Sequence, residues 1–92
     1  MTEAEQLEAV KKALNITGSF QDDTINLFIN DVKCYMKDAG VSPDIIQSDA
    51  SVGVIARGVS DLWNYGAGST TFSEYFYQRV IQLVARTVEE SE

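Results

Sequence analysis

The feature that most constrains the fold is a run of apolar residues at helical spacing between positions 25 and 39. Steps of three and four residues place these side chains on one face of an α-helix: Ile25, Phe28, Ile29, Val32, Tyr35, Met36 and Ala39. Gly40 follows where a left-handed C-terminal cap is expected, and Val41 can make the accompanying hydrophobic contact. Asp22 or Asp23 is expected to cap the start. The segment therefore predicts a long amphipathic helix.

A shorter helix is predicted at the beginning of the chain. Thr2 followed by Glu5 matches a capping box, in which each side chain accepts a hydrogen bond from the backbone amide of the other. An apolar stripe at helical spacing follows, formed by Leu7, Val10, Ala13 and Leu14. Asn15 and Gly18 are expected to end this helix, because both residue types tolerate a left-handed backbone.

Three further helical segments are predicted in the second half of the chain. Ser42–Pro43 indicates a cap followed by a first-turn proline, and it leaves room for only a short turn. A longer helix is expected from Asp49 or Ser51, with an inner face made of Val52, Ile55, Ala56, Val59, Leu62 and Trp63. The glycine-rich residues 66–71 interrupt it, and a final helix follows from about Ser73 to Val88. The fold class is therefore all-α, a small bundle of four main helices plus a short helical turn.

The final helix carries more apolar surface than one packed face needs. One side is supplied by Phe76, Val80, Leu83 and Val84, and the flanking positions Phe72, Tyr75, Tyr77, Ile81 and Val88 widen it. A helix that covers one side of a small domain needs an apolar arc of about 100°. Two explanations stay open: the helix is central to a compact bundle, or a neighbouring subunit buries part of the arc.

The residues that enzymes most often use are scarce. The chain has no histidine, which removes the commonest general base and the commonest transition-metal ligand. Cys34 is the single cysteine, so an intrachain disulfide cannot form, and we expect it in or near the core. The acidic pairs lack the spacing of a calcium loop. We therefore expect no catalytic residues, no metal site and no cofactor.

The charge of the chain limits its partners. The formal net charge is −7, and the few basic residues are diluted by acids along the whole chain. Binding to nucleic acid or to anionic lipid requires clustered Lys and Arg, so neither is expected. No apolar run approaches the roughly 20 residues that span a bilayer, and the acidic N-terminus is unlike a signal peptide. The composition favours a soluble protein made in a cytoplasm, folding as one domain over residues 1–92 with residues 1–2 and 89–92 flexible.

Aromatic residues gather on both sides of residues 66–71. The group consists of Trp63, Tyr65, Phe72, Tyr75, Phe76 and Tyr77. We expect Trp63 and Phe76 to pack in the core. Tyr65, Tyr75 and Tyr77 cannot all face one small core, and aromatic residues with polar ends are favoured at protein interfaces. At least one of them is therefore predicted to contact a partner.

Two segments resemble a known family. They are IARGVSDLWNYGAG at residues 55–68 and FSEYFYQRVIQL at residues 72–83. Together with the helical pattern of the first half, they resemble the head–tail connector proteins of Gram-positive phages and prophages, also called head-completion or DNA-packaging adaptor proteins. The resemblance covers nearly the whole chain, and the aromatic and glycine-rich stretch is its most specific part.

The resemblance implies a structural role in the neck of the virion. Members assemble as a ring beneath the portal protein once the head is filled, extend the DNA channel and offer a platform to the next neck or tail-completion protein. Double-stranded DNA would pass without specific binding, and an acidic wall suits that passage. Assembly would take place in the cytoplasm of the bacterial host. We expect the interface with other subunits to include Trp63, Tyr65, Phe72, Tyr75, Tyr77 and Arg79.

A second hypothesis is an acidic regulatory or inhibitory module that binds a basic host protein. It predicts that the acids gather on one face of the molecule. Their even spread along the sequence gives this alternative no support.

Overall fold

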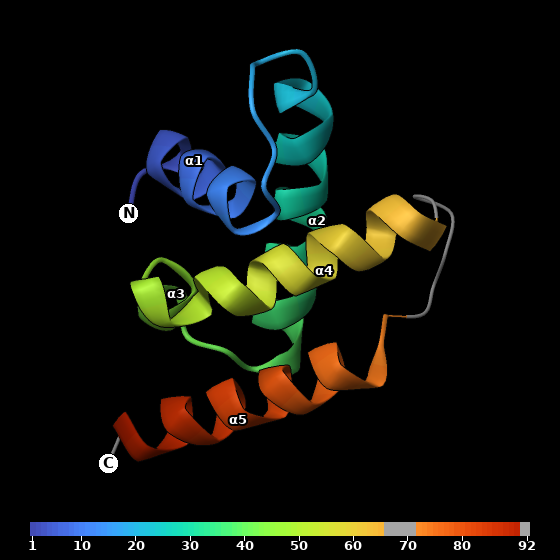
Figure 1. Cartoon of the computed structure of the whole chain (residues 1–92). Helices are drawn as coiled ribbons and strands as arrows, with labels where there is room; N and C mark the ends of the chain where they lie inside the picture. The colour runs from blue at the N-terminus through green and yellow to red at the C-terminus, as the bar shows by residue number, and fades with distance from the viewer. Residues whose placement is uncertain (66–71, 91–92) are drawn as a thin grey trace.

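The computed structural model describes residues 1–65 and 72–90, and every regular element in these ranges is helical (Figure 1). The elements are α1 (Glu3–Ala13), α2 (Asp22–Ala39), α3 (Pro43–Ile46), the 3-10 turn η1 (Asp49–Ser51), α4 (Val52–Tyr65) and α5 (Glu74–Glu90). The prediction of an all-α fold with four main helices and a short helical turn is confirmed. The predicted interruption at residues 66–71 lies outside the described residues.

Several helix boundaries form as the sequence predicts. Thr2 and Glu5 make the complete capping box: the Thr2 amide donates to Glu5 Oε1 at 2.9 Å and the Glu5 amide to Thr2 Oγ1 at 3.1 Å. At α3 the Ser42 hydroxyl accepts from the Ile45 amide at 3.3 Å. Gly40 ends α2 in the left-handed region, with φ 111°, which a residue with a Cβ adopts only with strain.

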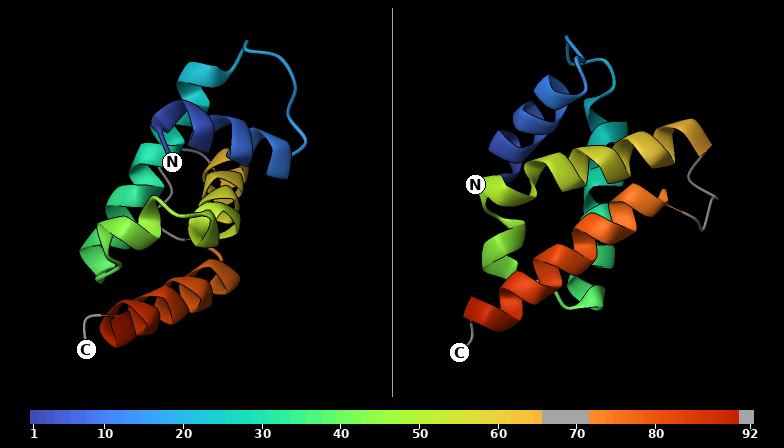
Figure 2. Two further views of the ribbon diagram at one scale, coloured as in Figure 1. Left: turned by 90° about the vertical axis from the view of Figure 1, so that its left-hand side faces the viewer. Right: turned by 60° about the horizontal axis from the view of Figure 1, so that its bottom comes forward.

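The core forms where α2, α4 and α5 meet. α4 crosses α2, while α1 and α5 lie on opposite sides of α4 (Figures 1 and 2). Gly58 allows this close crossing, because a Cβ at this position would lie 2.8 Å from Val32 and 3.0 Å from Phe76. Each main helix contributes fully buried side chains to the core, among them Val10, Ile25, Val32, Met36, Ile55, Val59 and Phe76.

The predicted cap of α2 is wrong. Gln21 holds the N-cap position and makes no side-chain capping bond, so neither Asp22 nor Asp23 caps the helix. Asp22 is instead the first helical residue, where the positive end of the helix dipole favours a carboxylate. Its Oδ1 lies 2.8 Å from Nζ of Lys11, an ion pair that the sequence pattern of a single helix does not reveal.

Three further predictions of burial are wrong. Cys34 is exposed, because it follows Val32 by two residues, which turns it about 200° away from the buried face of α2. Trp63 is 40% exposed, because it lies in the last turn of α4, where that helix extends past its crossing with α2 (Figure 1). Ala39, at the end of α2, is also exposed. Phe76 is completely buried, as predicted.

Candidate functional site

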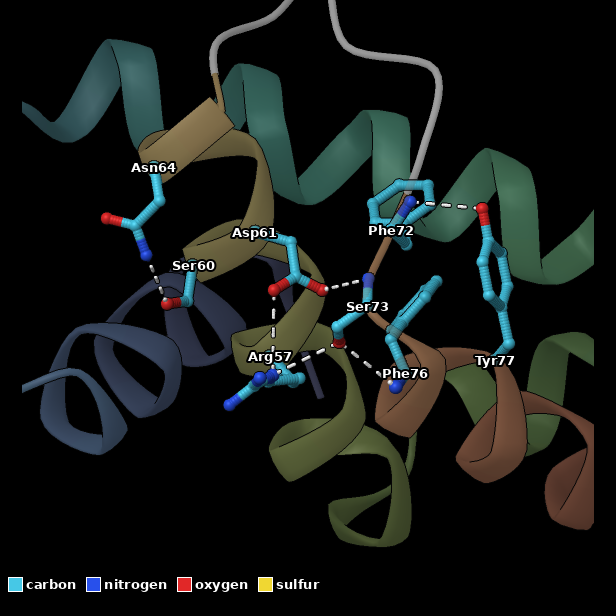
Figure 3. Close-up of polar contacts among 8 residues, drawn as sticks. All are labelled: Arg57, Ser60, Asp61, Asn64, Phe72, Ser73, Phe76 and Tyr77. Atoms are coloured by element: carbon cyan, nitrogen blue, oxygen red, sulfur yellow. Dashed lines mark hydrogen bonds and ion pairs between the residues drawn. The ribbon is translucent and has the colours of Figure 1, made fainter.

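The start of α5 is fixed to α4 by a group that we call the α4–α5 junction, formed by Arg57, Asp61 and Ser73 (Figure 3). The buried Asp61 carboxylate accepts the Ser73 amide at 2.9 Å through one oxygen and lies 3.5 Å from Arg57 Nε through the other. The Ser73 hydroxyl accepts from Arg57 Nε and from the Phe76 amide, both at 3.3 Å. Ser73 therefore caps α5 while Asp61 holds Ser73, so the junction sets where the aromatic residues of α5 lie.

Four aromatic rings pack together beside this junction. Phe72 lies 4.4 Å from Phe76 between ring centroids, and Tyr35 of α2 lies 5.3 Å from Phe72, 5.6 Å from Phe76 and 5.8 Å from Tyr77. The Phe72 amide donates to the Tyr77 hydroxyl at 3.0 Å (Figure 3). Burial raises the pKa of Tyr35, with a smaller contribution from Tyr77. Phe72 and Tyr77 thus make their ring contacts and their hydrogen bond within this chain, which leaves less of their surface for a partner.

Two other predicted interface residues present aromatic surface. Trp63 meets Phe28 edge to face at 5.9 Å and leaves much of its indole uncovered. Tyr75 is 59% exposed, and the Arg57 guanidinium lies over its ring at 5.6 Å from the centroid. A cation in this position is attracted to the face of the ring. Trp63 and Tyr75 are therefore the members of the predicted set best placed for another molecule.

The last two residues of the predicted interface are Arg79 and Tyr65, and neither presents a described exposed surface to a partner. Arg79 is half-buried and donates to Gln82, three residues further along α5. Tyr65 ends α4, and its side chain lies outside what the structure describes. The predicted set is thus divided between rings that pack inside the chain and rings at its surface.

Sequence analysis missed two exposed apolar residues near the start of α2. Phe20 is 98% exposed, and Leu27 is 57% exposed. The segment that carries Phe20 is held by Lys11, whose Nζ donates to the Gly18 carbonyl at 2.5 Å and pairs with Asp22. We call Lys11, Gly18 and Asp22 the α1–α2 junction. The signal was present in the pattern: Phe20 follows a predicted helix end, and Leu27 falls off the buried stripe of α2.

The broad apolar arc of α5 also extends beyond the core. Phe76, Val80 and Leu83 are buried, whereas Ile81 is 66% exposed on the outer side of the same helix. Ala85 and Val88 are also exposed, four and seven residues further along α5, so Ile81 is part of an apolar stripe, and contiguous exposed apolar surface marks contacts with other proteins. This observation favours the second explanation of the arc, in which a neighbouring molecule covers part of it.

The described residues offer little for catalysis. No group of three or more His, Cys, Asp or Glu side chains in residues 1–65 and 72–90 could hold a metal ion. None of the helices in these ranges is long and apolar enough to cross a membrane. An all-helical fold with fixed junctions and large apolar side chains at its surface is typical of a protein that acts through contacts with other proteins.

The family is given by comparison with known proteins. Residues 4–92 match the family of phage gp6-like head-tail connector proteins. The protein therefore belongs to this family, which is structural and non-enzymatic, and it is a component of the phage virion. The resemblance drawn from residues 55–83 is confirmed over nearly the whole chain. No curated protein and no solved structure matches the chain.

Proposed function

We propose that the protein assembles as a ring between the portal protein and the next neck or tail-completion protein, extends the DNA channel and provides a docking platform. Membership of the head–tail connector family carries this proposal. The ring would form in the host cytoplasm on a head already filled with DNA. In the assembled neck each subunit would contact its neighbours, the portal above it and the tail side below it.

The exposed apolar side chains support self-association. A cyclic ring uses a heterologous interface, in which one patch of each subunit meets a different patch of the next. Tyr75 and Ile81 expose apolar surface on α5, whereas Phe20 and Leu27 expose it at the α1–α2 end of the molecule. Phe20 precedes α2 and Leu27 lies in its N-terminal half, which is on the α1 side of α4, whereas α5 lies on the other side (Figures 1 and 2). The molecule therefore has separate surfaces for two different neighbours.

The charges support passage of DNA without specific binding. Against 14 acidic residues the chain has 7 basic ones. Lys11, Arg57 and Arg86 already lie within 4.0 Å of carboxylates of their own chain. Counterion release, the main source of affinity for duplex DNA, needs several cations that reach phosphates together. An acidic ring would guide DNA by repulsion from its wall.

The experiment is complementation of a phage that lacks this protein, with Trp63→Ala and Tyr75→Ala as separate variants. We expect DNA-filled heads without tails and a loss of infectious titre of about tenfold or more, because truncation of a central interface aromatic costs about 2 kcal/mol. Phe20→Ser tests the second surface in the same way. Gln78→Ala is the matched control, since Gln78 is exposed on α5 and polar.

Each variant is first checked for an unchanged helical circular dichroism spectrum, so that loss of folding is not mistaken for loss of contact. Fully tailed, infectious particles from all three aromatic variants would contradict the assigned surfaces. Normal particles made without the protein itself would contradict the connector function.

A further inference from the structure

A groove runs between α2 and α3 on a side of the molecule that the family comparison leaves without a role. Its α2 wall includes Lys33, Cys34 and Lys37, and the other side is lined by Pro43 of α3, which is exposed, and Ile46, which is 4% exposed, around a hollow of about 330 Å³. A second hollow of about 100 Å³ continues it toward α1; it shares Asn30 and Lys33 with the first and has the acidic Glu3 in its lining. Spaces of this size accommodate a few side chains. The groove therefore combines an apolar side with a basic wall.

Among residues 1–65 and 72–90, neither lysine has an acidic partner. Lys33 donates to Gln6 Oε1 at 2.8 Å, and Gln6 Nε2 donates to the Ile46 carbonyl at 2.9 Å, so neutral groups hold this ammonium in place. Lys37 is exposed. In the part of the chain that the structure describes, neither ammonium comes within 4.0 Å of a carboxylate. Two adjacent unpaired cations in a protein of net charge −7 favour an acidic occupant.

The outer face of α5 has the matching chemistry. Ile81 is 66% exposed, Ala85 and Glu89 are exposed, and their spacing of four residues places the three on one side of the helix. They span about 12 Å, and the groove wall from Asn30 to Lys37 spans about 10 Å, at 1.5 Å per helical residue. This face thus offers a large and a small apolar side chain, Ile81 and Ala85, followed by the Glu89 carboxylate.

An α5 helix that fills this groove has to come from a second copy of the chain. Phe76, Val80 and Leu83 hold α5 against the core of its own subunit, and no residue of α5 lines the groove. We propose that the α2–α3 groove of one subunit binds the C-terminal half of α5 from the next, with Ile81 and Ala85 against Pro43 and Ile46, and Glu89 beside Lys37. The inference rests on the proposed self-association and names the two surfaces that meet.

This contact has the symmetry that a ring requires. Groove and helix face are different surfaces, so each subunit can give one and receive the other, and the contacts continue from copy to copy. A nine-residue helical segment in a shallow groove buries less than the roughly 1,200 Å² of a stable complex. The free chain therefore associates weakly, and a covalent trap is the suitable probe.

Cys34 provides that trap, because it lines the groove and is exposed. The wild-type chain is mixed with a size-tagged variant that carries both Cys34→Ser and Ala85→Cys. Both chains are present at about millimolar concentration, so that a contact with a dissociation constant below this value is largely formed. Oxidised glutathione serves as the oxidant. We expect a mixed disulfide between Cys34 of one chain and the new cysteine of the other, seen on a non-reducing gel and located by mass spectrometry. The matched control places the cysteine at Arg86, an exposed position turned about 100° on the same helix.

Charge reversal then tests the ionic part. Lys37→Glu in the wild-type partner should lower the yield of mixed disulfide several-fold, and Glu89→Lys in the other chain should restore it. Equal yields from the Ala85 and Arg86 cysteines, or no rescue by Glu89→Lys, would overturn the proposal. The proposal would also be overturned if the protein bound a short DNA duplex and Lys37→Glu abolished that binding, since the groove would then be a binding site for DNA phosphates.

The result separates this inference from the connector function. If the disulfide fails to form while Trp63→Ala particles lack tails, the connector function stands and this groove contact is wrong. If the disulfide forms while phage lacking the protein assemble normally, the contact stands and the connector function is wrong.

Discussion

The two junctions of the molecule solve the same problem with opposite charges. At the α1–α2 junction the buried cation Lys11 reaches the Gly18 carbonyl and the Asp22 carboxylate. At the α4–α5 junction the buried anion Asp61 accepts the Ser73 amide and pairs with Arg57. An exposed aromatic ring stands next to each, Phe20 at the first and Tyr75 at the second.

The difference lies in what each charge holds. Lys11 is a long side chain that ties down a carbonyl outside the helices, and its bond to Asp22 raises its pKa against the opposing effect of burial. Asp61 is short and holds the backbone at the first turn of α5, together with the hydroxyl that caps that helix. A whole helix depends on the second junction, whereas the first mainly orders a connection. The α4–α5 junction should therefore be the more sensitive to substitution.

The largest expected effect is that of Asp61→Ala. The change leaves the Ser73 amide without its acceptor and Arg57 without its carboxylate, which should lower the free energy of unfolding by about 2 kcal/mol. Urea denaturation followed by circular dichroism measures it. Asp31→Ala removes an exposed carboxylate from α2 and serves as the control, with an expected change near zero. Equal stability of the two variants would show that the junction does not hold α5.

Lys11→Met is expected to cost less than Asp61→Ala. Methionine keeps much of the buried aliphatic stem and loses the ammonium, and the Asp22 side chain is 26% exposed, so water can replace its partner. The matched control is Lys12→Met, which changes the neighbouring exposed lysine. The same denaturation assay applies. A loss larger than that of Asp61→Ala would reverse the ranking of the two junctions.

The same contrast shows which parts the sequence could predict. The helices, the Thr2–Glu5 box and the Gly40 cap follow from local patterns, because each depends on residues within one or two turns. The junctions do not, because Lys11–Asp22 and Asp61–Ser73 join residues from different elements, and only the folded chain sets their distance.

The candidate interface shows the same limit. The sequence could identify the aromatic group, yet burial depends on where α4 crosses α2. The sequence therefore predicts Trp63 in the core although it is 40% exposed, and the exposed Phe20 is absent from the predicted interface because it is isolated in sequence from the other aromatics.

The contact between Tyr75 and Arg57 tests how much the exposed part of the α4–α5 junction contributes to the free energy of unfolding. Their cation–π contact lies at an exposed site, where such a pair contributes about 0.5 kcal/mol. A double-mutant cycle with Tyr75→Leu and Arg57→Met should give a coupling energy of that size, measured by denaturation. A coupling near zero would mean that Arg57 acts only through Asp61 and Ser73. A coupling well above 1 kcal/mol would mean that the ring itself holds the junction.

The smallest effect concerns the first turns of the two helices. α1 begins with a titrating cap, since the Thr2 amide donates to the Glu5 carboxylate and this bond lowers the pKa of Glu5 below its ordinary value. α5 begins with the Ser73 hydroxyl, which has no charge to lose in this range. The Glu5 contribution to stability is therefore complete above the ordinary glutamate pKa and is lost as the pH falls through the lowered pKa.

Glutamine keeps the capping bond without the charge, so the stability of Glu5→Gln relative to the wild type should rise on acidification, whereas that of Ser73→Ala relative to the wild type should stay constant. A Glu5→Gln difference that does not change with pH would mean that the carboxylate charge adds nothing to the cap.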